Sequence, residues 1–173
     1  MKRIVVTGPE SSGKTTLCRA LATAWDVPWV SEYAREYLQE LSRLYRQDDL
    51  VRIAQEQWRR QQAAMGEGPF LFCDTGLLVL LIWSEVKYGQ VDPWITQTLR
   101  AQPADLYLLC RPDIPWEPDP LRENPDDREH LFVLYQQKLH TLGLSYRIIT
   151  GALPEQRLAQ AQEELQKRWP NKK

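Results

Sequence analysis

The sequence predicts an α/β fold, in which helices cover both faces of a mostly parallel sheet. Segments with strand character alternate with segments of helical periodicity along the whole chain. The strand segments are almost continuously apolar, as expected of strands that are buried on both faces. A chain of 173 residues also has the size of one such domain, since domains typically contain about 50 to 250 residues.

The first half of the chain supplies three strands and three helices. Residues 2–7 are β-branched and apolar, which favours a buried strand. Apolar residues then recur on one helical face between Leu17 and Ala24. Short apolar runs bounded by turn residues indicate two further strands, with two polar, helix-favouring segments between them. The expected strands are 2–7, 28–30 and 70–73, and the expected helices are 14–25, 32–44 and 48–65.

The second half continues the alternation. An apolar helix is expected first and a shorter helix after it, followed by a fourth strand and, much later, a fifth. Pro154 is acceptable in the first turn of the last helix, where its missing N–H costs nothing. The expected helices are 77–86, 92–101 and 154–168, and the expected strands are 106–110 and 147–150.

Residues 111–127 interrupt this pattern with five prolines among acidic residues. A polar segment of this length inside a compact domain is usually a functional lid or disordered, and the alternative is a plain surface excursion. We therefore expect one domain over residues 1–170, with a lid at about 111–128, and a frayed end at 171–173.

Composition excludes several classes of protein. The 22 basic and 23 acidic residues give a net charge of −1, so no basic excess favours nucleic acid or a membrane surface. The apolar run 77–83 is far shorter than the roughly 20 residues that span a bilayer, and the apolar start of the chain ends too early for a signal peptide. Three scattered cysteines predict neither disulfides nor zinc, which favours a reducing cytoplasm.

The segment Gly8 to Thr15 fits G-x-x-x-x-G-K-[ST] at every fixed position, between a predicted strand and a predicted helix. Its backbone N–H groups are expected to bind phosphate at the helix N-terminus. Lys14 would reach the β- and γ-phosphates, and the Thr15 hydroxyl would ligate Mg²⁺. The sequence therefore predicts a bound nucleoside triphosphate and Mg²⁺, and the preference for ATP over GTP stays open at this point. The predicted nucleotide contacts are Gly8, Glu10, Ser11, Ser12, Gly13, Lys14, Thr15 and Thr16.

Two acidic residues follow other strands, at the sheet edge where ligands of open α/β sheets bind. Asp74 ends an apolar run, as does the Walker B acid that holds Mg²⁺ directly or through water, and its alternative role is a helix N-cap. Glu32 could accept the proton of an attacking hydroxyl, or it could be a first-turn helix acid paired with Arg35. Which of the two is the general base stays open.

The segments after the third and fourth strands separate classes of P-loop protein. No N-K-x-D or D-x-x-G follows them, which argues against a GTPase. An oligomeric AAA-type motor usually has a larger domain and an acidic pair after its third strand. Arg122 and Arg128 instead indicate an arginine-bearing kinase lid, which excludes water and stabilises phosphoryl charge. Their alternative role is solvated surface charge.

The sequence resembles the nicotinamide riboside kinase family, which comprises the ribosylnicotinamide kinase domain of the bacterial NAD-synthesis regulator and stand-alone relatives. The likeness extends over nearly the whole chain, and its P-loop part is generic. The matching motifs are G-P-E-S-S-G-K-T at 8–15, S-E-Y-A-R-E at 31–36, F-C-D-T at 72–75, P-D-I-P-W-E at 112–117, L-R-E-N-P at 121–125 and R-E at 128–129.

This resemblance implies ATP-dependent phosphorylation of the 5′-hydroxyl of nicotinamide riboside. It also implies a P-loop NTPase three-layer sandwich with a five-stranded parallel sheet of order 2-3-1-4-5 and a lid after strand 4. Ser31 stands where regulator-type sequences usually have an aromatic residue, so the ring that stacks on the base stays open among Trp29, Tyr33, Trp83, Tyr88 and Trp116. The predicted acceptor-binding residues are Glu32, Tyr33, Arg35, Asp74 and Trp116.

Catalysis is assigned to Lys14, Glu32, Asp74, Arg122 and Arg128, and metal binding to Thr15 and Asp74. The expected partner is a small nucleoside, with no nucleic acid or membrane, and a homo-oligomer stays possible. Two other functions stay open. One is another nucleoside or nucleotide kinase on the same scaffold, and the other is a regulatory module that binds ATP without acceptor-stimulated turnover.

Overall fold

The computed structural model describes residues 1–121 and 126–171, and it confirms the predicted sheet. Five parallel strands lie in the order β2-β3-β1-β4-β5. Each predicted strand is present, and the bounds differ from the prediction by at most one residue at either end. The strands are β1 (Lys2–Thr7), β2 (Trp29–Val30), β3 (Phe70–Asp74), β4 (Leu106–Cys110) and β5 (Tyr146–Ile149).

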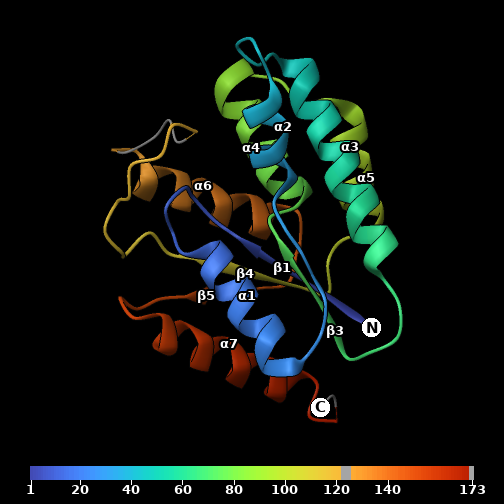
Figure 1. The fold of residues 1–173 in the computed structure, drawn as a ribbon, viewed down its shortest axis with the longest axis vertical. Coiled ribbons are helices and arrows are strands. Elements are labelled where there is room, and N and C mark those ends of the chain that lie inside the picture. Colours follow the sequence, from blue (N-terminus) through green and yellow to red (C-terminus); the bar gives the residue numbers. More distant parts are fainter. Residues whose placement is uncertain (122–125, 172–173) are drawn as a thin grey trace.

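Helices cover both faces of this sheet, as the α/β prediction requires. Figure 1 shows α1 and α7 on one face and α3 to α6 on the other, which gives three layers. The helices are α1 (Lys14–Trp25), α2 (Tyr33–Glu40), α3 (Gln47–Ala64), α4 (Leu77–Tyr88), α5 (Pro93–Ala101), α6 (Arg128–Thr141) and α7 (Pro154–Arg168).

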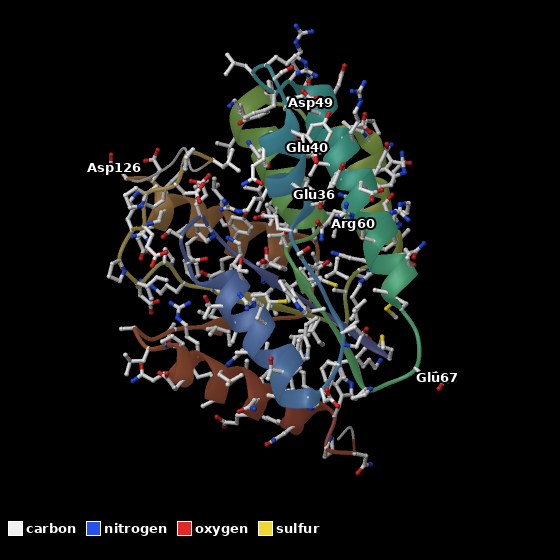
Figure 2. The ribbon with its side chains drawn as sticks, in the orientation of Figure 1. Glu36, Glu40, Asp49, Arg60, Glu67 and Asp126 are labelled. Atoms are coloured by element: carbon white, nitrogen blue, oxygen red, sulfur yellow. The ribbon has the colours of Figure 1, made fainter. Side chains whose placement is uncertain are left out.

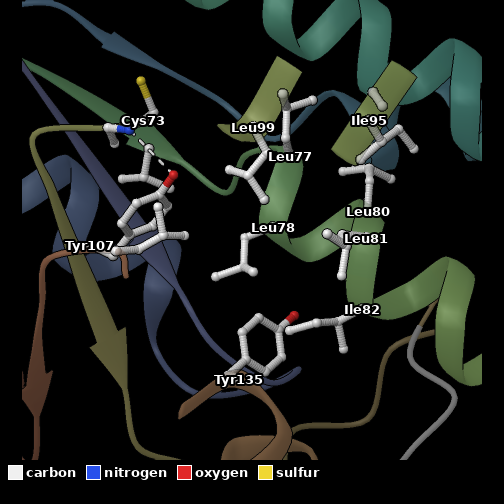
Figure 3. Close-up of a cluster of buried hydrophobic side chains, with 14 of the residues drawn as sticks. Cys73, Leu77, Leu78, Leu80, Leu81, Ile82, Ile95, Leu99, Tyr107 and Tyr135 are labelled. Carbon is white, nitrogen blue, oxygen red and sulfur yellow. Dashed lines mark hydrogen bonds between the residues drawn. The ribbon is translucent and has the colours of Figure 1, made fainter. Parts of the chain in front are cut away.

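Two apolar cores follow from the alternation of side chains along the strands. On β1, Ile4 and Val6 belong to the core beneath α1 and α7, whereas Val5 belongs to the core beneath the other helices. The second core is rich in leucine from α4, which packs near Tyr107 and Tyr135 (Figure 3). Each fully buried side chain of this kind contributes about 1.5–3 kcal/mol, so both faces of the sheet are held firmly.

Helix α6 is absent from the sequence prediction. Its buried residues, Leu131, Phe132, Tyr135 and Leu139, are spaced for one helical face, which is the signal that could have revealed it. The proline-rich segment directly before it obscures where regular structure resumes. The predicted helix 32–44 is also too long, because α2 ends at Glu40.

The residues between α2 and α3 are held by a buried carboxylate instead of by helical hydrogen bonds. Asp49 accepts two hydrogen bonds from Arg43, at 2.7 and 2.9 Å, and one from the Arg46 backbone N–H at 2.7 Å. Figure 2 shows Asp49 close to α2, on the same side of the molecule as Glu36 and Arg60.

The carboxyl ends of β1, β2 and β3 meet at one edge of the sheet, which is where the P-loop, Glu32 and Asp74 lie. Within the predicted lid, the described residues 111–121 and 126–127 contain no helix or strand, and Arg128 begins α6. No helix among the described residues has the length and apolar character needed to cross a membrane.

Candidate active site

The backbone of the P-loop depends on glycine at its start. Gly8 has φ 137°, and a Cβ atom there would lie 2.6 Å from the carbonyl oxygen of Cys110 on β4. Any side chain at this position would therefore push the loop away from the sheet. Further along, Ser11 and Gly13 have φ 49° and 77°, both in the left-handed region. Alternation of this kind builds a nest of inward-facing N–H groups that binds anions.

Side chains of the P-loop brace the loop from within. The Ser12 hydroxyl and the Lys14 ammonium both donate to the Pro9 carbonyl oxygen, at 2.7 and 2.6 Å. Ser12 is buried, whereas Lys14 is half-buried and Thr16 is exposed at the start of α1. Lys14 thus stands within reach of a phosphate bound in the nest.

Asp74 is joined directly to the P-loop. Its side chain is 1% exposed, and its Oδ2 accepts a hydrogen bond from the Thr15 hydroxyl at 2.6 Å. The other oxygen, Oδ1, is buried without a hydrogen-bond partner among the described residues. Burial raises the pKa of Asp74, while the Thr15 hydrogen bond and the Lys14 charge oppose that rise.

The capping role considered for Asp74 does not describe its geometry. The N-cap of α4 is Gly76, and no side chain caps that helix. Between them Thr75 has φ 66°, an uncommon conformation for a β-branched residue. Its N–H donates to Val6 O at 3.0 Å and its carbonyl accepts from Gln61 at 3.0 Å. These bonds fix the turn that aims Asp74 at the P-loop.

Glu32 is the N-cap residue of α2, and its side chain makes no capping hydrogen bond. Burial raises the pKa of Glu32, the Lys14 charge opposes the rise, and the Asp74 charge adds to it. The pairing considered with Arg35 is not observed, because the Arg35 guanidinium bonds Asp119 of the lid at 2.9 Å. Glu32 therefore has the surroundings of a general base, with a raised pKa and no ion pair among the described residues.

The P-loop forms part of the wall of a cavity of about 260 Å³. Residues 8–16, Glu32 and Arg35 supply polar groups to this wall. Helices α2, α4 and α6 supply a broad apolar region next to them, which includes Leu38, Val79, Ile82, Trp83, Leu131 and Tyr135. One cavity thus joins a phosphate-binding surface to an apolar compartment that contains two aromatic rings.

Among the predicted site residues that the structure describes, four do not line this cavity. Asp74 is linked to it through Thr15. The Tyr33 ring instead lies under the Arg60 guanidinium, with 4.2 Å between the ring centroid and Cζ. The backbone N–H of Tyr33 donates to the Gln57 side chain. The other two, Trp116 and Arg128, pack together at 5.6 Å.

The lid contacts the P-loop through one backbone N–H and one guanidinium. The Glu117 N–H donates to the Ser11 hydroxyl at 3.0 Å. The Arg128 guanidinium donates to the carbonyl oxygens of Ser11 and Ile114, both at 3.0 Å. Arg122, the second predicted lid arginine, lies outside the described residues.

Sequence reasoning missed Tyr135, Leu131 and Arg157. The first two belong to α6, whose periodicity would have found them. Trp83 was one of five aromatic candidates for base stacking, and it lines the cavity while its indole N–H donates to the Tyr45 hydroxyl at 2.9 Å. No local signal distinguishes Arg157, because its partners are distant in the sequence.

Comparison with known proteins identifies the family. The sequence profile of a family described as an AAA domain matches residues 3–157. The chain belongs to this AAA-domain family. The description shares the name of the oligomeric motors that the sequence analysis disfavoured, and it does not by itself choose between motor and kinase chemistry.

Curated relatives of this AAA domain include the trifunctional NAD biosynthesis/regulator protein NadR of Salmonella typhimurium and of Escherichia coli. Each is 25% identical over 128 residues, which cover 70% of this chain and 31% of the relative. The chain thus spans about a third of the length of these relatives. The resemblance to the bacterial NAD-synthesis regulator, stated from the motifs, is confirmed.

Solved structures show the same fold in kinases. NadR in complex with NR superposes with a TM-score of 0.78 at 24% identity, covering 96% of this chain and 51% of that one. Thymidylate kinase from Ehrlichia chaffeensis gives 0.67 at 15% identity, with 95% and 98% covered. Deoxyadenosine kinase from M. mycoides gives 0.66 at 14%, with 95% and 99% covered. The AAA domain therefore has the α/β fold of these proteins.

Proposed function

We propose that this AAA domain is a kinase that transfers the γ-phosphoryl group of ATP to the 5′-hydroxyl of nicotinamide riboside, giving nicotinamide mononucleotide. The observation that carries the proposal is the single cavity that joins the P-loop to an apolar, aromatic compartment, with Glu32 in its wall. Binding ATP alone gives no reason for such a compartment beside the phosphates. A second ligand with a ring and a hydroxyl does.

In this proposal the P-loop holds the triphosphate by backbone N–H groups and by the Lys14 side chain. The loop is pre-shaped by the hydrogen bonds at Pro9, so little ordering remains to be done on binding. A charged residue in this position stabilises the transferring phosphoryl group more than the ground state.

The residues present fit a magnesium ion. Oxygen donors suit Mg²⁺, which usually keeps several waters and takes one or two protein ligands in addition to substrate phosphates. Thr15 and Asp74 supply such oxygens, and the unpaired Asp74 Oδ1 is the atom best placed to bond a metal or its water. No larger cluster of metal ligands is found in the described part of the chain, as this mode of binding allows. When bound, the ion would neutralise phosphate charge.

Glu32 is the proposed general base. Its raised pKa brings it nearer to working pH than that of an ordinary glutamate, which improves proton transfer from the 5′-hydroxyl. Arg35, also in the cavity wall, is proposed to orient the acceptor. The transition state of phosphoryl transfer is largely dissociative, so positioning contributes more than deprotonation.

The apolar compartment is proposed to bind the base of the acceptor. Trp83 and Tyr135 come from α4 and α6 and supply flat surfaces on which an aromatic ring can stack. Support comes from the structure of NadR with NR, part of which has the same fold as nearly all of the present chain. Arg122 and Arg128 are proposed to stabilise phosphoryl charge, Arg128 from outside the cavity wall, where its guanidinium bonds the Ser11 and Ile114 carbonyl oxygens. The ATP analogue in a second NadR structure supports nucleotide use.

A panel assay tests this function. The chain is incubated with ATP, Mg²⁺ and single nucleosides, ADP release is measured, and the product is identified by mass and by periodate sensitivity, since a 5′-phosphate leaves the 2′,3′-diol free. Nicotinamide riboside is expected to stimulate ADP release most. Stimulation by a purine or pyrimidine nucleoside instead would mean that this nucleoside is the acceptor. Tight ATP binding without stimulation by any acceptor would favour a regulatory module. Lys14→Ala serves as the inactive control.

A further inference from the structure

Arg157 is a buried charged residue that the proposed catalytic steps do not use. It lies on α7, on the far side of the sheet from the acceptor compartment, and is 3% exposed. Burying a guanidinium costs several kcal/mol unless each of its donors finds an acceptor. Its partners should therefore reveal what the fold gains from it.

Those partners come from three separate segments that border the P-loop. Nη1 donates to the Ser12 carbonyl at 2.7 Å, Nε donates to the Gly151 carbonyl at 2.7 Å, and Nη2 donates to the Arg111 carbonyl at 2.8 Å. These acceptors belong to the P-loop, to the turn after β5, and to the chain that leaves β4 for the lid. One side chain thus joins three loops through their backbones.

Asp113 completes the arrangement. It forms an ion pair with Nη2 of Arg157 and also accepts a hydrogen bond from the Gly151 N–H at 2.8 Å. The charge of Arg157 is therefore compensated locally, and the turn after β5 is held through both its N–H and its C=O. This pairing is what allows the guanidinium to stay buried beside a loop that must bind anions.

The bond to Ser12 has a consequence for phosphate binding. The C=O of Ser12 and the N–H of Gly13 belong to one trans peptide, whose planarity makes the two groups point in opposite directions. Holding the carbonyl toward α7 turns the Gly13 N–H to the other side, where residues 8–16 line the cavity. Arg157 can thus fix the direction of a phosphate-binding donor without touching phosphate.

Arg128 acts on the preceding peptide in the same way. It donates to the Ser11 carbonyl at 3.0 Å, which orients the Ser12 N–H. Ser11 has φ 49°, and such a conformation costs roughly 1–3 kcal/mol and persists when its surroundings enforce it. Two arginines from two helices therefore hold successive carbonyls on the outside of the loop.

We propose that Arg157 is a positioning residue of the phosphate-binding loop, which keeps the Gly13 N–H directed at the nucleotide and ties the P-loop to the lid base and the turn after β5. The proposal rests on the proposed nucleotide site and adds a residue to it. It predicts that loss of Arg157 weakens nucleotide binding selectively, whereas a residue that serves stability alone would change melting temperature without this selectivity.

The test compares Arg157→Ala and Arg157→Lys with Arg168→Ala, a control on the same helix whose guanidinium pairs with Glu164 at the surface. The Kd for AMP-PNP with Mg²⁺, the melting temperature, and KM for ATP and for the acceptor are measured. We expect Arg157→Ala to weaken AMP-PNP binding about tenfold or more, as loss of a charged hydrogen bond would, with KM for the acceptor nearly unchanged. Arg157→Lys should recover little, because one ammonium cannot replace a fork that bonds three loops.

Chemical rescue separates positioning from packing. Ethylguanidinium should restore AMP-PNP binding to Arg157→Ala, and ethylammonium at the same ionic strength should not. If Arg157→Ala fails to fold, Arg157→Lys and Asp113→Asn carry the same comparison. Unchanged AMP-PNP affinity in a folded Arg157 variant would overturn the proposal, as would an equal rise in KM for ATP and for the acceptor. Since the readout is nucleotide binding, a wild-type chain that binds AMP-PNP but phosphorylates no nucleoside would contradict the proposed function and leave this test intact.

Discussion

Asp49 and Asp74 are both buried, at 0% and 1% exposure, yet their surroundings are opposite. Asp49 accepts four hydrogen bonds, from Arg43 twice, from the Tyr37 hydroxyl and from the Arg46 N–H. Asp74 accepts one from Thr15, and its Oδ1 has no partner among the described residues. The Arg43 guanidinium holds the pKa of Asp49 well below its usual range, whereas burial raises the pKa of Asp74.

The difference separates a structural carboxylate from one prepared for a ligand. A buried charge whose bonds are all made stabilises its loop and has nothing left to offer. A buried charge with an unpaired oxygen costs stability in the free protein, and a bound cation or its water would recover that cost. Asp49 holds the α2–α3 connection, whereas Asp74 faces the P-loop. The destabilising carboxylate thus lies at the sheet edge that carries the P-loop.

The largest effect is expected from the P-loop itself. Lys14→Ala and Thr15→Ala should each lower the rate of phosphoryl transfer by about 10³-fold or more. The first variant removes the basic side chain that contacts the phosphates, and the second removes the hydroxyl that bonds the Asp74 carboxylate. Circular dichroism should show an intact fold. The matched control is Lys138→Ala, which removes a surface lysine paired with Glu85 on α4. Normal turnover in either P-loop variant would exclude this loop as the active site.

Glu32→Gln should lower kcat by about 10²–10⁴ if Glu32 is the general base, and by less if the transition state needs little base. Because burial raises the pKa of Glu32, the wild-type kcat should fall with decreasing pH at a value above the ordinary glutamate pKa of about 4.3. The variant should lack this acidic limb. Glu36→Gln, on the exposed face of the same helix, should retain the acidic limb of the kcat profile. Loss of that limb in Glu36→Gln would mean that a group other than Glu32 titrates.

Asp74→Asn should raise the Mg²⁺ concentration needed for half-maximal rate by about tenfold, since a charged oxygen is removed from the metal's surroundings. Stability should not fall. A raised folded-state pKa means that the ionised carboxylate disfavours folding, fully so above that pKa and not at all below the unfolded value. Replacing the charge by an amide should therefore leave the melting temperature unchanged or raise it, and a lower one would mean that Asp74 is structural after all.

What the sequence predicted, and what it missed, follows the same division. The strands, the P-loop and the acids at the strand ends are local patterns, since buried parallel strands are apolar and the phosphate nest occupies eight consecutive residues. Asp49 resembles an ordinary first-turn helix acid beside Asp48, because three of its four bonds depend on how residues 41–46 fold back. Arg157 bonds Ser12 across 145 positions, and no periodicity records such a contact.

The cavity was missed for a related reason. Part of its apolar wall comes from α6, and the sequence prediction assigned no helix to residues 128–141, where that helix lies. Tyr33 and Trp116 were chosen from conspicuous motifs, but a motif does not reveal which face of its element a ring occupies. Tyr33 is turned toward Arg60 and α3, and Trp83 lines the cavity from a stretch that the sequence marked as an apolar helix.

Asp49→Asn is the counterpart of the Asp74 variant and should have the smallest effect on catalysis. It leaves buried donors facing an amide that bonds them less strongly, so we expect a loss of about 1–3 kcal/mol in the free energy of unfolding, toward the lower end because water screens the half-exposed Arg43. A lowered folded-state pKa gives stability that is present above the unfolded value of about 3.9 and lost as pH falls through the folded one. Urea unfolding at pH 7 and in strong acid should therefore separate wild type from Asp49→Asn at neutral pH and bring them together as Asp49 protonates. Asp48→Asn, the exposed neighbour, should unfold like wild type at both pH values. A variant at Asp49 that keeps its stability and loses turnover would mean that the two aspartates cannot be told apart by the hydrogen bonds they accept.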